Sequence, residues 1–306
     1  MIVRPLLPTD FARLEQEGGR IQQYGRNLKR WLDDGYLNEP DCYVFKNNGA
    51  LLGGVCFCDD TEEEREILDF ALNDIIPGGC ELLIRAVQQA SKPSTRKISY
   101  NLYDDTEQFT EIQNLFYRAG FSVEQEKLRY AYESPLPPSS SVALRFKSIA
   151  ETGEDLFTDM VEAVTVNTLD RLMAADAARL GSRRAAREYV ESLKKIHFNP
   201  DWWRLGYAGD ELVGLILPQR FNETFGAINY VGVLPKYRGW SYGRSLLAEG
   251  TRILIENGTK KICADIDVAN YPMVNALEHL GYVFRMKELV LVNTNLSLCL
   301  VHKYSY

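Results

Sequence analysis

The sequence predicts an α/β (α+β) fold made of two tandem domains, each a mixed, mainly antiparallel and twisted sheet flanked by helices. Its 306 residues, 45% of them hydrophobic, exceed a typical single domain and can fill two cores. A proline- and serine-rich stretch near the middle interrupts any regular element. Two separated blocks of sequence also recur at one constant offset. The predicted parts are a first domain over residues 1–133, a linker over 134–142 and a second domain over 143–306.

The repeat has an offset of 161 residues. Ala50–Val55 falls on Glu211–Ile216, a short hairpin strand with its glycine, and Leu115–Phe121 falls on Ala276–Tyr282. Because one offset serves both blocks, we interpret the chain as two copies of one domain.

Hydrophobic periodicity places the first elements of the second copy. Residues 144–149 alternate as a strand. Residues 155–196 are helical, with Leu156 and Met160 at helical spacing, and Gly181 breaks this stretch into two helices. The stretch is longer than its counterpart in the first copy, which indicates an elaborated covering segment.

Strands and helices alternate over the remainder. Pro272 suits the first turn of a helix, and Gly281 suits a left-handed C-cap. The expected order is β-α-α-β-β-β-α-β-α-β. The expected elements are strands over 203–208, 211–217, 227–233, 261–268 and 287–292, and helices over 244–256 and 271–280.

The segment Val233–Gly243 reads VLPKYRGWSYG between a predicted strand and a predicted helix. The first N–H groups of a helix lack internal partners, and the helix dipole favours negative charge there. A pyrophosphate can therefore bind largely through backbone, and glycines allow it to approach closely. The alternative is an ordinary strand-turn-helix corner.

Within this segment, Arg238–Gly243 resembles the acyl-CoA signature R-x-x-G-x-G/A of the GCN5-related N-acetyltransferase (GNAT) family. Ser241 stands where the first signature glycine is usual, and serine resists a positive φ, so we expect a slightly altered loop. Asn270, followed by a helix closing in Leu-Gly-Tyr at 280–282, resembles the second motif of the family. The predicted order of elements is also the one that the resemblance implies.

The resemblance implies an N-acyltransferase that moves an acetyl group from acetyl-CoA to a primary amine of a small molecule or peptide, by direct attack in a ternary complex. A backbone N–H in the region 231–233 would stabilise the oxyanion. The implied cofactor-binding residues are Val231, Gly232, Val233, Arg238, Gly239, Trp240, Ser241, Tyr242, Gly243 and Asn270.

The proton-transfer residues depart from the family pattern. Leu277 occupies the position of the usual acid tyrosine, and Asn229 that of the usual carboxylate base. By residue type and position, the catalytic candidates are Tyr230, Asn229 and Tyr271. A non-catalytic CoA-binding regulatory or scaffold protein therefore stays open as an alternative. Asn167, Asp170 and Arg171 lie in the segment that forms the acceptor wall in the family, although each also fits a surface position.

The first copy lacks most of the signature at the same offset. Gly239 keeps a partner in Gly78, but Gly243 falls on Leu82, which would put a side chain where a phosphate should approach. We interpret the first copy as degenerate, without a standard CoA site; a local insertion would change this alignment. The other matches are Arg238 on Pro77, Ser241 on Cys80 and Asn270 on Phe109.

Composition limits the partners and the location. Residues 1–133 carry 15 Lys+Arg and 23 Asp+Glu, net −8, whereas the rest is net +1. This balance disfavours nucleic acid and mildly favours a cationic acceptor, although the acidic run Asp59–Glu64 also fits a solvated loop. No signal peptide or membrane span is expected, which indicates a cytoplasmic protein, monomer or homodimer. No metal is expected, because these residues show no paired ligand spacing: Cys42, Cys56, Cys58, Cys80, Cys263, Cys299, His197, His279 and His302.

Overall fold

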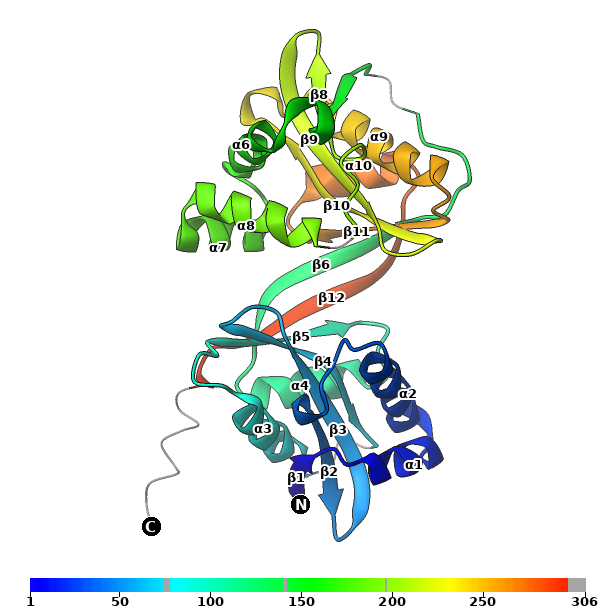
Figure 1. The fold of residues 1–306 in the computed structure, drawn as a ribbon, viewed down its shortest axis with the longest axis vertical. Coiled ribbons are helices and arrows are strands. Elements are labelled where there is room, and N and C mark those ends of the chain that lie inside the picture. The colour runs from blue at the N-terminus through cyan, green and yellow to red at the C-terminus, as the bar shows by residue number, and fades with distance from the viewer. Residues whose placement is uncertain (74–76, 140–141, 196, 297–306) are drawn as a thin grey trace. The chain divides into compact units, whose positions relative to one another are not determined.

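The computed structural model describes residues 1–73, 77–139, 142–195 and 197–296. The chain forms two compact units. The first comprises Met1–Glu124 and Glu288–Tyr306, and the second comprises Gln125–Lys287. Figure 1 shows the elements of each unit.

The first unit contains a mixed sheet in the order β1-β2-β3-β4-β5, with β12 paired to β5. Only the β4–β5 pair is parallel. Its strands are β1 (Ile2–Pro5), β2 (Cys42–Asn47), β3 (Ala50–Asp59), β4 (Glu64–Leu72) and β5 (Lys97–Tyr103). Its helices are α1 (Pro8–Gln16), α2 (Gly19–Asp33), α3 (Gly79–Ala90) and α4 (Phe109–Arg118), with the 3-10 turn η1 (Glu39–Asp41).

Helices cover both faces of this sheet because successive side chains of a strand point to opposite sides. Val44 and Cys56 pack in the core beneath α1 and α2. Phe45 and Phe57 pack in a second core with α3 and α4. Two buried faces explain why β2 and β3 are almost continuously apolar.

The second unit repeats this plan in the order β6-β11-β10-β9-β8-β7, where only the β10–β11 pair is parallel. α9 and α10 share one core with the sheet, and α5, α6 and α8 share another. Its strands are β6 (Ser122–Tyr132), β7 (Arg145–Ser148), β8 (Arg204–Ala208), β9 (Glu211–Arg220), β10 (Phe225–Val233) and β11 (Lys261–Asp267). Its helices are α5 (Ile149–Thr152), α6 (Glu154–Thr165), α7 (Arg171–Leu180), α8 (Ser182–Lys194), α9 (Tyr242–Glu256) and α10 (Tyr271–His279), with the 3-10 turn η2 (Pro235–Tyr237). The strand that pairs with β5 in the first unit is β12 (Val283–Asn293).

Strand pairing confirms the repeat residue by residue. β3 pairs with β4 through Val55 and Phe70, and β9 pairs with β10 through Ile216 and Val231, the same pair displaced by 161 residues. Each pair contains an irregularity at the same place. It leaves Leu68 without a register partner in the first unit and Asn229 in the second, as one extra residue does in a β-bulge.

The two copies exchange their last strands. Residues 127–132 of β6 pair with β11, whereas residues 288–293 of β12 pair with β5. The registers are equivalent: Arg129 lies opposite Asp265, and Val290 lies opposite Asn101. The unit boundary consequently falls inside β6 and inside β12.

The compact units thus differ from the division of the sequence into 1–133, 134–142 and 143–306, which stays a prediction about independent folding. The reason is that a proline-rich segment shows where a strand ends, but not which sheet that strand joins. Within the predicted linker 134–142, residues 134–139 and 142 belong to no helix or strand; residues 140–141 lie outside the described part.

The predicted elements of the second copy are present, with ends that differ by a few residues. Gly181, with φ 82, separates α7 from α8 as predicted. The stretch over 155–196 holds three helices instead of two, since α6 ends at Thr165 and α7 begins after the N-cap Asp170. The segment between them is not helical and lies at the site described next.

Candidate functional site

A cavity of about 640 Å³ opens in the second unit between the ends of β10 and β11. The parallel pairing of these strands covers only residues 225–227 with 261–263. Beyond it, both strands line the cavity, together with the start of α9, α10 and the segment after α6. This volume lies in the range of small-molecule sites.

The inner edge of β10 presents backbone N–H groups to this cavity. The N–H of Leu234 donates to Val213 at the end of β9. Successive N–H groups of a strand point to opposite edges. The N–H groups of Val231 and Val233 therefore face away from β9, toward the cavity that both residues line. This is the edge where the sequence predicts an oxyanion donor.

The turn before α9 forms an anion-binding geometry. Ser241 is the N-cap of α9 and adopts a left-handed conformation with φ 63, and Gly239 has φ 85. Among the described residues, the backbone N–H groups of residues 239–243 have no hydrogen-bond partner. Five free N–H groups at a helix N-terminus form a site for a phosphate. Ser241 thus accepts the positive φ that its residue type was expected to resist.

Gly243 leaves open space beside this turn. A Cβ built on Gly243 would lie 3.7 Å from Cγ2 of Val233, which is ordinary contact. The fold therefore does not require a glycine at this position for packing or for a positive φ. A larger side chain would extend from the first turn of α9 into the cavity that Gly243 lines.

The Arg238 side chain binds protein backbone. Its guanidinium donates to the carbonyl oxygens of Val164 and Val166 at 2.9 Å, of Asn167 at 2.9 Å and of Val233 at 3.2 Å. Three of these carbonyls belong to the end of α6 and the residues that follow it. The sequence predicts Arg238 as a cofactor-binding residue. In the structure, Arg238 lines the cavity, but its guanidinium is hydrogen-bonded to the carbonyl oxygens of this segment.

Asn270 is the N-cap of α10, where its side-chain Oδ1 accepts from the N–H of Met273 at 3.4 Å. It lines the cavity at the end of β11, as the motif predicts. The acceptor oxygen serves the helix, so the Nδ2 group is the part of the side chain that a ligand can use.

The cavity has an acidic end. Asp267 is 2% exposed and accepts from Nε of Arg171 at 2.8 Å and from Nε2 of Gln125 at 2.9 Å. Burial raises the pKa of Asp267, but the hydrogen bonds from Arg171 and other donors outweigh it, so the net pKa is lowered. Asp170 caps α7 through the N–H groups of residues 172 and 173 and also accepts from Gln125 at 3.3 Å. The two carboxylates therefore share the Gln125 amide, and the guanidinium of Arg171 pairs with Asp267.

The catalytic candidate Tyr230 lines the cavity, and its hydroxyl lies beside the end of α6. Its hydroxyl is 3.3 Å from Oγ1 of Thr165, and its ring meets that of Tyr189 at 5.4 Å. Burial raises the pKa of Tyr230 and the charge of Asp170 adds to the rise, whereas the Thr165 hydrogen bond lowers it. The net pKa lies above the usual range, so the hydroxyl is protonated at neutral pH.

The other predicted site residues are placed differently. Asn229 lines the cavity, and its side-chain amide donates to Gln219. Tyr271 is 69% exposed and lies outside the cavity lining, as does Trp240, which is 66% exposed and stacks on Tyr242. Asn167 and Asp170, which the resemblance places in the acceptor wall, line the cavity. Arg171 forms an ion pair with Asp267.

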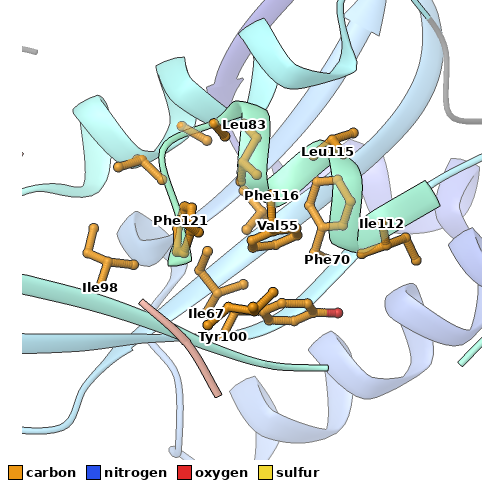
Figure 2. Close-up of a cluster of buried hydrophobic side chains, with 14 of the residues drawn as sticks. Val55, Ile67, Phe70, Leu83, Ile98, Tyr100, Ile112, Leu115, Phe116 and Phe121 are labelled. Atoms are coloured by element: carbon orange, nitrogen blue, oxygen red, sulfur yellow. The ribbon is translucent and has the colours of Figure 1, made fainter. Parts of the chain in front are cut away.

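The equivalent space of the first unit is filled by aromatic rings. Phe116 stacks on Tyr100 with ring centroids 4.4 Å apart and meets the edge of Phe70 at 5.3 Å (Figure 2). The matching residues of the second unit are Leu277, Ala264 and Val231, which line the cavity. Large side chains thus replace small ones at all three positions.

A guanidinium also closes the first unit. Arg20 donates to the carbonyl oxygen of Phe70 at 3.1 and 2.8 Å, to that of Glu107 at 3.2 Å and to the Tyr100 hydroxyl at 3.3 Å. Asn73, the counterpart of Leu234, donates to β3 at Leu52, so the Phe70 carbonyl points to the opposite edge. In the first copy, aromatic rings therefore fill the space that corresponds to the cavity, and Arg20 is hydrogen-bonded across it. These two features support the interpretation of this copy as degenerate.

The loop alignment at an offset of 161 is wrong. The N-cap of α3 is Gly78, with φ 93, and its counterpart is the N-cap Ser241, an offset of 163. Gly78 therefore matches Ser241 instead of Gly239, and Cys80 matches Gly243 instead of Ser241. The turn before α3 is two residues shorter than the one before α9, an insertion that sequence blocks outside the loop could not reveal. The matches of Pro77 with Arg238 and of Leu82 with Gly243 are therefore also wrong. The offset of 161 still holds for α4 and α10, whose C-caps are Ala119 and Leu280.

The described residues contain no cluster of three or more His, Cys, Asp or Glu that could hold a metal. Burial raises the pKa of Cys42 and of Cys58 to about 12, which keeps both thiols protonated at neutral pH. Cys299 and His302 lie outside the described residues. Across the described part of the chain, no helix combines the length and apolarity that crossing a bilayer requires.

Residues 171–282 match the family model described as "Acetyltransferase (GNAT) family". Two curated proteins called mycothiol acetyltransferase are similar over short stretches. The protein of Corynebacterium efficiens is 29% identical over 82 residues, 27% of this chain and 28% of its own length. That of Corynebacterium aurimucosum is 36% identical over 59 residues, 19% of each chain. The chain thus covers less than a third of either relative.

Solved structures share the fold over most of the chain. A GCN5-related N-acetyltransferase from Sphaerobacter thermophilus superposes with a TM-score of 0.65 at 16% identity and covers 95% of each chain. A tandem GNAT protein from the clavulanic acid biosynthesis pathway superposes with a TM-score of 0.51 at 13% identity, over 82% of this chain and 81% of its own. At these identities, the likeness concerns the fold alone.

Proposed function

We propose, from the match of residues 171–282 to the GNAT acetyltransferase family model, that this chain is an N-acyltransferase that transfers an acetyl group from acetyl-CoA to a primary amine of a small molecule or peptide. The observation that carries the proposal is the row of unpartnered N–H groups at residues 239–243, which opens on the cavity between β10 and β11. The pyrophosphate would bind this row, and the thioester arm would follow the inner edge of β10. Asn270 would donate through Nδ2 to the arm.

The reaction would be direct. The amine nitrogen attacks the thioester carbonyl carbon, a C–N bond forms, and the C–S bond breaks to release the CoA thiolate. The N–H groups of Val231 and Val233 would stabilise the oxyanion, a contribution that can reach about a hundredfold in rate for one donor. The protonated Tyr230 hydroxyl is the group best placed to give a proton to the thiolate, while the amine loses its proton to solvent.

The acidic end of the cavity favours an acceptor that carries a positive charge. Asp170 and Asp267 both accept from the Gln125 amide, and the guanidinium of Arg171 pairs with Asp267, so two carboxylates stand against one arginine within this group. A cation bound there would be attracted more strongly than in water, because the surroundings are partly buried. Asp170, which belongs to the segment between α6 and α7, lines the cavity together with Asp265 and Asp267.

The test is thermal unfolding with and without saturating acetyl-CoA for the parent, Gly243→Ala and Gly243→Leu. Ligand at about a hundred times Kd adds roughly 2.7 kcal/mol, or about 4 °C in Tm for a chain of this size that unfolds as one unit. Alanine should keep the shift because its Cβ has room, and leucine should abolish it. Equal shifts in Tm for all three proteins would show that acetyl-CoA does not bind at this turn.

A second candidate is a CoA-binding regulatory or scaffold protein without turnover. It is favoured by Leu277 and Asn229, which replace the usual acid and base, and by the commitment of the Asn229 amide to Gln219. Acyl transfer to a panel of polyamines, aminoglycosides and peptide N-termini separates the two. Substantial kcat/KM with any acceptor would exclude the second candidate.

A further inference from the structure

We propose that Arg238 is a latch that couples the cofactor turn to the acceptor wall, and that its side chain is not a phosphate ligand. The inference rests on the proposed function, because it concerns the same cavity. The wall is the segment Val164–Asp170, here called the lid, which joins α6 to α7. Five of its residues line the cavity: Val164, Asn167, Thr168, Leu169 and Asp170.

The donor count supports this assignment. A guanidinium has five N–H donors. In Arg238, four of them are directed to the carbonyl oxygens of Val164, Val166, Asn167 and Val233. One donor is left, which is too few for the bidentate contact that makes arginine a good phosphate ligand.

The carbonyl oxygens at the end of α6 that accept from Arg238 are favourable partners for a cation. The last carbonyls of a helix lack internal partners, and the helix dipole makes this end negative. Val164 lies in the last turn of α6, and Val166 is its C-cap. A single guanidinium therefore satisfies the end of α6 and fixes the direction in which the chain leaves it.

Arg238 holds the middle of the lid, at Val166 and Asn167. Elsewhere in the lid, the N–H of Thr168 donates to Thr165 at 3.0 Å, and Asp170 accepts from Gln125 at 3.3 Å. Asn167 has φ 53, a left-handed value that costs free energy in a non-glycine residue. Val166 and Leu169 are 51% and 46% exposed. Below the lid, α6 rests closely on β10: a Cβ on Gly232 would lie 2.5 Å from Cγ2 of Val164. The base of the lid is thus fixed by packing, and its middle by Arg238.

The consequence is an order of binding. Arg238 directly precedes the free N–H groups of residues 239–243, so a phosphate that orders this turn also fixes the guanidinium and, through it, the lid. Acetyl-CoA should bind first and complete the acceptor wall. The side chain left to contact the phosphates is Arg244, which lines the cavity at the first turn of α9 and contacts the Ser241 hydroxyl.

The experiment compares Arg238→Gln, Arg238→Lys and the matched control Arg244→Gln. Acetyl-CoA affinity is measured by titration calorimetry, and hydrogen exchange is measured over residues 164–170 with and without acetyl-CoA. For both Arg238 variants we expect a Kd within about threefold of the parent, with lid exchange at least tenfold faster and no longer slowed by acetyl-CoA. For Arg244→Gln we expect a Kd raised tenfold or more and unchanged lid exchange without ligand.

Two results would overturn the latch. The first is a tenfold or greater loss of acetyl-CoA affinity in both Arg238 variants, which would make the side chain a phosphate ligand. The second is lid exchange in these variants that equals that of the parent. If the parent binds no acetyl-CoA, the proposed function fails, but lid exchange without ligand still decides whether Arg238 holds the lid.

Discussion

Arg20 donates two hydrogen bonds, of 3.1 and 2.8 Å, to the carbonyl oxygen of Phe70, the residue of the first unit that corresponds to Val231. At Val231 the same strand edge faces a cavity. One fold therefore occurs twice in this chain, once with the strand edge occupied by the protein itself and once with the edge open. The contrast supports the proposed binding of acetyl-CoA along the open edge.

Phe116→Ala tests the closed unit. Because Phe116 is buried between Tyr100 and Phe70, the change should lower the free energy of unfolding by about 3–5 kcal/mol. Acetyl-CoA affinity should change less than twofold, since the proposed site lies in the other unit. Urea unfolding and calorimetric titration measure the two effects. A second equivalent of bound acetyl-CoA would contradict the prediction.

Ser241→Gly tests the strained cap. Serine at φ 63 costs more than glycine there, so the change should raise the free energy of unfolding by up to about 1 kcal/mol and preserve acetyl-CoA binding. Ser241→Ala, which loses the hydroxyl but keeps the Cβ, is the control for the contact with Arg244. Thermal unfolding of both variants with the parent provides the comparison. A glycine variant less stable than the alanine variant would argue against strain at this residue.

Asp170→Asn tests the cationic acceptor. Asparagine can still cap α7, so the fold and acetyl-CoA binding should be retained. Loss of the charge should raise KM for an amine acceptor about tenfold or more and change kcat little. The matched control is Asp176→Asn, which removes an exposed carboxylate from the same helix. Steady-state kinetics with the best acceptor of the panel are the measurement, and equal KM values for both variants would refute a role for this charge.

Asp267 should make the stability of the second unit depend on pH. Its pKa is lowered in the folded state, so its stabilising effect is present above the unfolded value of about 3.9 and disappears as the pH falls through the folded value. Asp267→Asn should therefore cost about 1.5–3 kcal/mol at pH 7 and progressively less below about pH 4. Urea unfolding of parent and variant at pH 7, 4.5 and 3 measures the difference. A difference independent of pH would mean that the carboxylate charge is not what stabilises the site.

Fragments test the exchanged strands. Residues 143–306 lack β6, whose Tyr130 and Tyr132 are buried in the core with α9 and α10. Residues 125–287 retain β6 and all the described cavity residues. We expect cooperative urea unfolding and acetyl-CoA binding from the fragment 125–287 only. If 143–306 folds and binds equally well, the division drawn from the sequence is the correct one.

Local structure could be predicted from the sequence because local rules determine it. Gly281 was placed as a left-handed C-cap and has φ 88, and Gly181 separates two helices. The strand partners could not be predicted. β6 and β12 descend from the same segment of the repeat and carry similar patterns, so each fits the neighbour of the other.

The positions that line the cavity could be predicted where they belong to a short sequence motif. The turn over 238–243 and Asn270 line the cavity, apart from the exposed Trp240. The buried carboxylate Asp267 was missed because its partners are distant in sequence; Gln125 is 142 residues away. No local pattern reports such a contact.

The exchange of β6 and β12 has a consequence for how this chain can evolve. A duplicated copy that has lost its pocket would ordinarily be free to accumulate disruptive changes or to be deleted. Here residues 127–132 complete the sheet of the open copy, and residues 288–293 complete that of the closed one. Selection for the chemistry of one copy therefore also preserves the fold of the other, and neither half of the gene can be discarded alone.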